Sequence, residues 1–373
     1  MKLTVERAHL LKALGHTQSV VERRNTIPIL SNVRLEATDG YLALTATDLD
    51  IAVSTQAESE VTVPGGTTAP AHMLHDIVRK LPDGAQIFLD FDVDAGRLNI
   101  VSGRSQFTLS CLPREDFPVM HQGDLPIAFT LPAGELRRII DKTQFAISME
   151  ETRYYLNGIY LHTVVETDVN VLRAVATDGH RLAKVELPLP EGADAMEGVI
   201  IPRKTVGELK KLLNETDDDV EVALSDTKIR LSVGDAVLTS KLIDGTFPDY
   251  ARVIPSRNEE FMDVDARELM SAVDRVSTIA TDKSRAIKMS IDAVGRMAIS
   301  AMSPENGTAE EELGISYGGN KIEIGFNSKY LMDVATQIEG ENAHFEFSDA
   351  TSPTIVRDSS DEGALYVLMP MRV

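Results

Sequence analysis

The sequence predicts an α+β protein made of three tandem copies of one module, each with two helices and an antiparallel sheet. The first evidence is a set of short motifs that repeat at one spacing. An Ala-Thr-Asp tripeptide at 46–48 returns at 176–178, and a Phe-Pro pair at 117–118 returns at 247–248, in both cases 130 positions later. Because two separate anchors share this spacing, the first two thirds of the chain are predicted to hold two copies of one unit.

The third copy is fainter than the first two. Residues 265–273 are similar to 132–140, and the terminal Leu-Met-Pro at 368–370 takes the place of Thr-Phe-Pro at 246–248. A chain of 373 residues then has about 124 residues per copy, which is an ordinary domain size. The predicted domains are 1–126, 127–254 and 255–373.

Helical and strand-like patterns alternate along the first copy. Apolar residues at three- and four-residue spacing predict a helix over 7–24 and another over 72–80, which a Pro-Asp-Gly turn ends. Alternating apolar residues predict strands on both sides of an Asp-Gly turn at 39–40. Further strands are expected at 87–89, 98–101 and 107–109, and further helix-like segments at 133–146, 203–214, 265–285 and 328–338.

Composition and the first residues exclude several classes of protein. An apolar fraction of 43% and a charged fraction of 25% are typical of a globular chain. The N-terminus meets charged residues before any apolar run, and no run of about 18 apolar residues occurs. We therefore expect no signal peptide, no membrane contact and a cytoplasmic location. The single Cys111 cannot form an internal disulfide and is expected to be a small buried hydrophobe.

Motifs of enzymes are mostly absent. The chain has no phosphate loop, dinucleotide fingerprint, nucleophile elbow or metal motif, so we expect no cofactor and no metal. Asp178 and His180 are the most enzyme-like pair, because side chains two apart on a strand share a face. A hydrolase or isomerase is therefore one alternative, although no nucleophile lies nearby and a plain turn explains the same residues. Asp48 and Asp50 could ligate a metal, but a solvated loop edge is the simpler interpretation.

The charge of the chain has two interpretations. With 37 basic against 58 acidic residues, the net charge of −21 argues against a nucleic-acid-binding protein. Yet the predicted helix-like segments hold 18 basic and 10 acidic residues, so the acidic excess lies elsewhere. A basic helical surface inside an acidic protein is one possibility, and ordinary solvated faces of amphipathic helices are the other.

The C-terminal segment 364–373 is almost wholly apolar, where chain ends are usually polar. It is expected either to pair as a last strand in a core or to line an apolar groove. The two Met residues that flank Pro370 favour the groove, because flexible thioethers suit surfaces that accept varied partners.

Four motifs are similar to those of one known family. They are RYYLNG at 153–158, VATDGHRL at 175–182, GTFPDY at 245–250 and MPMR at 369–372. With these motifs in order, the chain resembles from end to end the bacterial DNA polymerase III β subunits, which are sliding clamps. The resemblance implies the clamp fold, in which two chains of three domains close head to tail into a homodimeric ring lined by helices.

The resemblance also implies a function. A family member is a non-catalytic processivity subunit that encircles double-stranded DNA without reading its sequence. It tethers the polymerase III catalytic subunit, the clamp loader and repair polymerases, each through a short peptide with Leu and Phe anchors. A multidomain interaction scaffold that never meets DNA is a further alternative.

The family's functional positions carry over to three sets of residues. The implied DNA contacts are Arg24, Arg153, Tyr154, Tyr155 and Lys204. The implied partner pocket is Leu156, Thr177, Gly179, His180, Arg181, Leu182, Pro248, Arg252, Val253, Asn327, Tyr330, Val367, Met369, Pro370, Met371 and Arg372. The implied dimer interface is Arg97, Arg104, Phe107, Leu109, Ile279 and Glu305, with Glu310, Glu311 and Glu312 nearby. A mobile acidic loop is the alternative interpretation of these glutamates.

One position departs from the family pattern. Glu150 lies in the loop before Arg153, where some relatives place residues that face DNA. A carboxylate repels phosphate, so we expect weaker direct contact with DNA at this loop.

Overall fold

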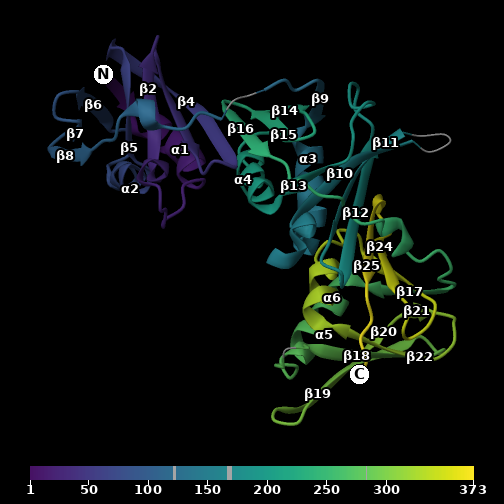
Figure 1. Cartoon of the computed structure of the whole chain (residues 1–373). Coiled ribbons are helices and arrows are strands. Elements are labelled where there is room, and N and C mark those ends of the chain that lie inside the picture. Colours follow the sequence, from purple (N-terminus) through teal and green to yellow (C-terminus); the bar gives the residue numbers. More distant parts are fainter. Residues whose placement is uncertain (121–122, 166–169, 283) are drawn as a thin grey trace. The chain divides into compact units, whose positions relative to one another are not determined.

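The computed structural model describes residues 1–120, 123–165, 170–282 and 284–373 (Figure 1). The chain divides into two compact units. Unit 1 is Met1–Arg137, Pro190–Ala195 and Lys204–Leu242, and unit 2 is Arg138–Leu189, Met196–Arg203 and Ile243–Val373. The division runs through the segment 127–254, because one part of that segment forms a sheet with strands from the start of the chain and the other part with strands from its end.

Unit 1 is built on a single antiparallel sheet. Among the described residues 12 strands belong to it, with the main order β8-β7-β6-β1-β4-β16-β15-β14-β9, and β2, β3 and β5 branch from this path. The strands are β1 (Lys2–Glu6), β2 (Asn32–Thr38), β3 (Tyr41–Thr47), β4 (Ile51–Val63), β5 (Gly65–Pro70), β6 (Gln86–Asp92), β7 (Arg97–Ser102), β8 (Ser105–Ser110), β9 (Ile127–Pro132), β14 (Asp219–Leu224), β15 (Lys228–Val233) and β16 (Ala236–Lys241).

Unit 2 contains two antiparallel sheets. The larger has the order β13-β10-β11-β12-β25-β24-β23-β17-β21, and the smaller has the order β20-β19-β18-β22. The strands are β10 (Gly158–Val165), β11 (Asn170–Thr177), β12 (Arg181–Pro188), β13 (Val199–Pro202), β17 (Glu260–Asp265), β18 (Ala286–Ile291), β19 (Arg296–Ser303), β20 (Gly307–Gly314), β21 (Ser316–Tyr317), β22 (Ile322–Asn327), β23 (Asn342–Phe347), β24 (Thr354–Asp358) and β25 (Asp361–Leu368).

Six α-helices occur in the described residues, two in each sequence repeat. They are α1 (Arg7–Gln18), α2 (Ala71–Lys80), α3 (Ala133–Thr143), α4 (Arg203–Leu213), α5 (Ala266–Ser277) and α6 (Ser328–Ala335). Short 3₁₀ turns are η1 (Pro28–Ser31), η2 (Arg114–Asp116), η3 (Gln144–Ala146), η4 (Glu151–Leu156) and η5 (Tyr250–Arg252). None of the helices in the described part of the chain is long and apolar enough to cross a membrane.

The predicted helices are correct in place, but all except the one at 72–80 run past the observed C-terminal end. The helix predicted over 7–24 stops at Gln18, and Val20 and Val21 after it are both buried. Val20 and Val21 continue the apolar pattern, but they lie in a turn after the helix, so burial of apolar side chains does not by itself extend a helix. The helix predicted over 265–285 likewise ends at Ser277. Helical segments are therefore shorter than the apolar pattern alone indicates.

The turn that carries the Ala-Thr-Asp motif is built in the same way in both copies. In the first copy Thr47 Oγ1 donates to the carbonyl of Ile51 (2.8 Å), and Asp48 Oδ1 accepts from the Ile51 amide (2.8 Å). In the second copy Thr177 Oγ1 donates to the carbonyl of Arg181 (2.7 Å), and the Arg181 amide donates to Asp178 Oδ1 (3.1 Å). The third turn position has positive φ in both, 81° at Leu49 and 88° at Gly179.

Candidate functional site

The end of β25 and the start of β12 bring two sequence features together in unit 2. The register pairs Arg181 with Leu368 and Leu182 with Val367, and the Met369 amide donates to the carbonyl of His180 (2.9 Å). The Thr-Asp-Gly-His-Arg turn and the apolar C-terminal tail, which are far apart in sequence, thus lie against each other. Of the two interpretations of the tail, residues up to Leu368 form a last core strand, and Met369 begins a partly exposed segment in which Pro370 and Met371 are half-buried.

The His180 side chain of this turn lies on the ring of Tyr330, from the first turn of α6. The ring centroids are 6.0 Å apart and the rings are nearly parallel, 18° between planes. Asn327 holds the start of α6, because its side chain accepts from the amides of Lys329 and Tyr330. Such an N-cap fixes the first helical turn and with it the direction of the Tyr330 ring.

Arg181 is buried beneath these rings, with only 7% of the residue exposed. Its guanidinium carbon lies 4.5 Å from the centroid of Tyr330, and its nitrogens pair with Asp178 (3.1 Å) and with Asp333 of α6. It also donates to the carbonyl of Phe145. The predicted pocket residue Arg181 therefore supports the site from below and links the turn to α6 rather than standing free in it.

An apolar cluster forms the floor of the same region. Three predicted residues, Leu156, Leu182 and Val367, are buried in it together with Phe247 and Tyr250. Pro248, Arg252 and Val253 lie exposed on the segment that Phe247 and Tyr250 anchor. The other members of the cluster are Val175, Ile200, Ile355 and Leu365.

The pair that suggested an enzyme is not arranged as an acid–base dyad. Asp178 Oδ1 accepts from the backbone amides of His180 (2.9 Å) and Arg181 (3.1 Å), and Oδ2 accepts from the Arg181 side chain. The carboxylate is thereby used to hold the turn, while the His180 ring lies on Tyr330. The hydrolase or isomerase alternative loses its proposed pair for this reason. In the described residues no three His, Cys, Asp or Glu side chains gather to hold a metal ion.

The first copy has the same backbone frame, meaning the turn and the strand end that is bonded to it, but different side chains lie around it. Ser240 pairs with Ile51, and the Lys241 amide donates to the carbonyl of Asp50 (2.8 Å), as the Met369 amide does to His180. Here Ser240 Oγ lies 2.6 Å from Thr205 Oγ1, and both residues are buried. Polar side chains therefore lie at this frame, whereas Met369 and the ring of Tyr330 lie at the frame of the second copy.

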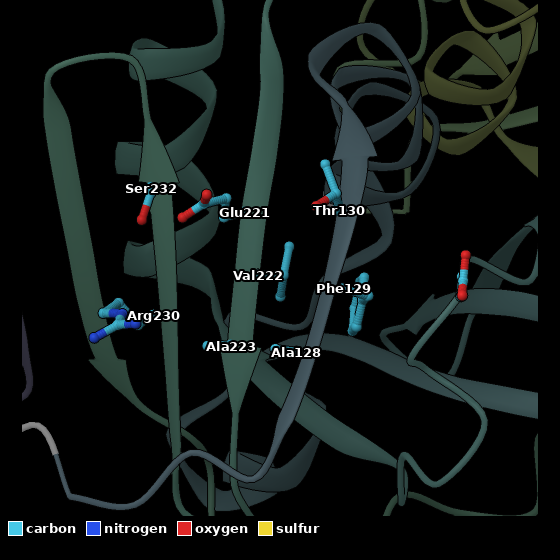
Figure 2. Close-up of a pocket in the computed structure, with 9 residues that line it drawn as sticks. Ala128, Phe129, Thr130, Glu221, Val222, Ala223, Arg230 and Ser232 are labelled. Atoms are coloured by element: carbon cyan, nitrogen blue, oxygen red, sulfur yellow. The ribbon is translucent and has the colours of Figure 1, made fainter.

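A hollow of about 460 Å³ lies elsewhere, on the sheet of unit 1 (Figure 2). Phe129 and Val222 lie in its middle, and Glu221, Arg230 and Ser232 lie on the neighbouring strands β14 and β15. It contains none of the predicted site residues.

Two of the predicted DNA contacts belong to unit 1. Arg24 is exposed in the loop after α1, and Lys204 lies at the start of α4. Burial opposes the charge of Lys204, but hydrogen bonds and charge from Asp48 (2.5 Å) and Glu22 (3.2 Å) outweigh it and raise the pKa of the ammonium. Lys204 is thus charged but already paired, which the sequence did not reveal.

The other three predicted DNA contacts lie on η4 in unit 2. Arg153 pairs with Glu150 (Nε to Oε2, 3.2 Å), Tyr154 is 54% exposed, and Tyr155 packs against the apolar cluster. The two tyrosine rings meet edge to face at 5.7 Å. The Glu150 carboxylate thus offsets the charge of the neighbouring Arg153 guanidinium.

The charge asymmetry remains when the helix bounds come from the structure. The six described helices carry 14 basic and seven acidic side chains, whereas the chain as a whole has a net charge of −21. The excess is largest on α4, with four basic residues and one acidic residue. The acidic charge therefore belongs to the strands and loops.

The predicted interface residues lie on or near two edge strands, β8 and β20. Arg97 and Arg104 are exposed beside β8, and Phe107 is 36% exposed, but Leu109 is buried in its own unit. Leu109 can therefore serve an interface only through its backbone. Glu305 is exposed just before β20, Ile279 is half-buried, and Glu311 pairs with Arg275 of α5 (2.5 Å).

Sequence reasoning did not identify Phe145 and Asp333, which hold Arg181. Asp333 is 152 positions from Arg181, and no local pattern signals a pair at that distance. It also did not identify Gly325, whose carbonyl accepts from the Met371 amide (2.9 Å). Contacts of this kind depend on how the chain folds back on itself.

Three family models match the chain in order. The model for the DNA polymerase III beta subunit, N-terminal domain, matches residues 1–121. The central-domain model of the same subunit matches 130–249, and the C-terminal-domain model matches 251–372. The prediction of three tandem modules is confirmed by this order.

Relatives of known identity match over their whole length. A beta sliding clamp of Caulobacter vibrioides NA1000 / CB15N is 53% identical over 373 residues, and that of Escherichia coli K12 is 40% identical over 374 residues, with 100% of both chains covered each time. A crystal structure of the C. crescentus beta sliding clamp superposes with a TM-score of 0.98 at 53% identity, covering 100% of this chain and 99% of the other. One from Bartonella birtlesii, bound to griselimycin, gives 0.97 at 51% identity, with both chains fully covered.

The domain order, the full-length identities and the shared fold agree with one another. The chain belongs to the beta sliding clamp family, the DNA polymerase III beta subunits, and is a non-catalytic DNA sliding clamp.

Proposed function

We propose that the surface around His180, Tyr330 and Met369 is the groove through which this sliding clamp holds its partner proteins. The observation that carries the proposal is the seating of the exposed C-terminal tail against the His180 turn, above an apolar floor. Two related structures support it. The C. crescentus clamp is described with PEG at a beta-motif tethering region, and the B. birtlesii clamp with griselimycin.

The proposed ligand is an extended peptide with Leu and Phe anchors. The buried residues Leu156, Leu182 and Val367 support the surface from beneath. The partly exposed thioethers of Met369 and Met371 can adapt to different side chains. Each anchor that becomes fully buried contributes about 1.5–3 kcal/mol. The polymerase III catalytic subunit, the clamp loader and repair polymerases would then compete for one groove. The full proposed set is the 16 residues that the resemblance implies.

Deleting residues 369–373 is expected to weaken binding of such a peptide by at least about 30-fold, because one wall of the groove is lost. A fluorescent Leu- and Phe-bearing peptide titrated against parent and truncated protein measures this. Val294→Ala, at an exposed residue between β18 and β19, is the control and should leave binding unchanged. Undiminished binding by the truncated protein contradicts the proposed groove.

We also propose that Arg24, Arg153, Tyr154, Tyr155 and Lys204 meet the DNA backbone. The basic excess of the helices supports this proposal, since phosphate binding needs local positive charge and no reading of bases. Glu22, Asp48 and Glu150 pair with two of these cations. Their presence favours weak, mobile contact over tight binding, which suits a ring that slides.

Arg24→Ala is expected to weaken static binding of duplex DNA to a similar extent for every sequence. The slope of log affinity against log salt should fall by about one, because one phosphate contact is lost. Fluorescence anisotropy across a salt series measures the slope, with Arg296→Ala as the matched control at an exposed arginine of unit 2. An unchanged slope would remove Arg24 from the proposed DNA contacts.

The third proposal concerns the ring itself. We propose that β8 of one protomer pairs with β20 of its partner, and that the arginines near β8 face the glutamates near β20. Both strands lie at sheet edges, and an unpaired edge is a ready template for pairing with another chain. Opposite charges on the two edges would set the register of a head-to-tail contact.

Two coarser predictions complete the proposal. The domain bounds 1–126, 127–254 and 255–373 are proposed from the sequence repeat, and the three family models match in the same order. A cytoplasmic location is proposed because a DNA sliding clamp acts where bacterial DNA is replicated.

A further inference from the structure

The C-terminal tail is fixed by two backbone hydrogen bonds to different elements of unit 2. The Met369 amide donates to the carbonyl of His180, and the Met371 amide donates to the carbonyl of Gly325, each at 2.9 Å. Pro370 between them has no amide proton to donate. The tail therefore crosses from the turn before β12 to strand β22, and Figure 1 shows the C-terminus beside β18 and β22.

Strand β22 has room for the tail because it lies at the edge of its sheet. It pairs with β18 on one side, and on the other side the bridge between Gly325 and Met371 is the contact found in the described residues. The tail thus covers part of an otherwise open strand edge.

Gly325 is the residue at which this contact is closest. A Cβ at position 325 would lie 2.5 Å from the carbonyl oxygen of Met371 and 2.4 Å from a methyl group of Val373. Distances below 3.0 Å require something to move. Gly325 is not among the residues with positive φ, so its backbone conformation does not require glycine. The close approach of the tail therefore explains why glycine is favoured at position 325.

The same strand also places Tyr330. Two residues after Gly325, Asn327 caps α6, and Tyr330 in the first turn of that helix stacks on His180. The contacts His180–Met369, Met371–Gly325 and Tyr330–His180 therefore form a closed loop around the proposed groove. A shift of the tail at Gly325 changes the position of Met371 relative to this loop.

We propose that Gly325 is a positioning residue of the partner groove, because the absence of its side chain lets the tail dock on β22. The inference rests on the proposed function, namely that a partner peptide binds between the His180 turn and the tail. Gly325 itself need not touch the peptide. Its role is to hold Met371, and through Pro370 the Met369 wall, in the geometry that the peptide meets.

Gly325→Ala is expected to lower the affinity for a fluorescent Leu- and Phe-bearing peptide about 3- to 10-fold, the equivalent of losing one hydrogen bond and the order it provides. The control is Gly318→Ala, since a Cβ at that position meets nothing within 4 Å. The dimer mass and the binding of DNA should stay those of the parent, because the change is confined to the tail.

A double-mutant cycle separates positioning from a general weakening of the fold. The three proteins are Gly325→Ala, a deletion of residues 371–373, and the two changes combined. If Gly325 acts through the tail, the combined variant binds no worse than the deletion alone. Additive losses, or parent-like binding by Gly325→Ala, would overturn the inference. If the parent itself fails to bind the peptide, the proposed function fails instead.

Hydrogen exchange on the unaltered protein gives a test that needs no variant. The Met371 amide is expected to exchange more slowly than the amides of Arg372 and Val373, since it is bonded to Gly325. Equal exchange at the three positions would mean that the tail is not docked, and would overturn the inference even if Gly325→Ala does not fold.

Discussion

Replacing Arg181 with Met is expected to lower the free energy of unfolding by about 3 kcal/mol, the largest loss we foresee from a single substitution. The side chain is 7% exposed and pairs with Asp178 and Asp333, whose side chains are 16% and 29% exposed. Removing one member of a largely buried ion pair leaves the other charges without a partner. The loss is set somewhat below that of fully buried pairs, because Asp333 still reaches water.

Urea unfolding followed by circular dichroism measures this difference. Arg252→Met is the matched control: Arg252 pairs with Asp249 but its side chain is 85% exposed, so its loss should stay within about 0.5 kcal/mol. If both variants unfold at the same urea concentration, Arg181 does not link the turn to α6 in the way described. Peptide binding by Arg181→Met should fall as well, since the Tyr330 ring loses its support.

Reversing the charge at Arg97 and Arg104 to Glu is expected to convert the dimer to monomers. In the proposed contact these arginines face the glutamates around Glu305 and Glu310, so the variant would place like charges opposite each other. Such a clash costs several kcal/mol across an interface. Light scattering should then report the chain mass of 40.8 kDa in place of twice that value. Arg24→Glu, an exposed arginine outside the proposed interface, should stay dimeric.

A mixing experiment makes this prediction specific to a head-to-tail ring. A second variant, Glu305→Arg with Glu310→Arg, should also be monomeric alone, because both of its edges are then positive. Mixed together, each variant meets an edge of opposite charge at both contacts, and a mixed dimer should form. A failure of the mixture to dimerise, or a dimer of either variant alone, contradicts the pairing of β8 with β20.

Sequence patterns predicted which helices and strands occur in this fold better than they predicted where each of them begins and ends. The helices lie where the apolar spacing indicates, because burial of one face is a local property of the sequence. The prediction missed β1, β4 and β5, and extended the first helix past Gln18. Strand β4 runs from Ile51 to Val63 and pairs with three other strands, so its length is set by its neighbours more than by its own residues.

Residues of the proposed functional surfaces were predictable only where they belong to a recognisable sequence motif. The resemblance named His180, Tyr330 and Met369. The contacts of Asp333 with Arg181 and of Gly325 with Met371 join residues far apart in sequence, and no local pattern indicates them. Lys204 shows the reverse case: its identity suggested a free cation, and the structure pairs it with Asp48 and Glu22. Leu109 looked like an interface residue and is buried in its own unit.

The sequence by itself determined the three tandem modules, the two helices in each, the family and the local excess of basic residues on the helices. These follow from spacing and composition, which are read along the chain. The tertiary structure decided which side chains lie around each of two equivalent turns. Both copies build the same turn, but Thr205 and Ser240 close the first with a hydrogen bond, whereas Tyr330 and Met369 stand at the second. The residues that fill each frame come from distant segments, and only folding brings them together.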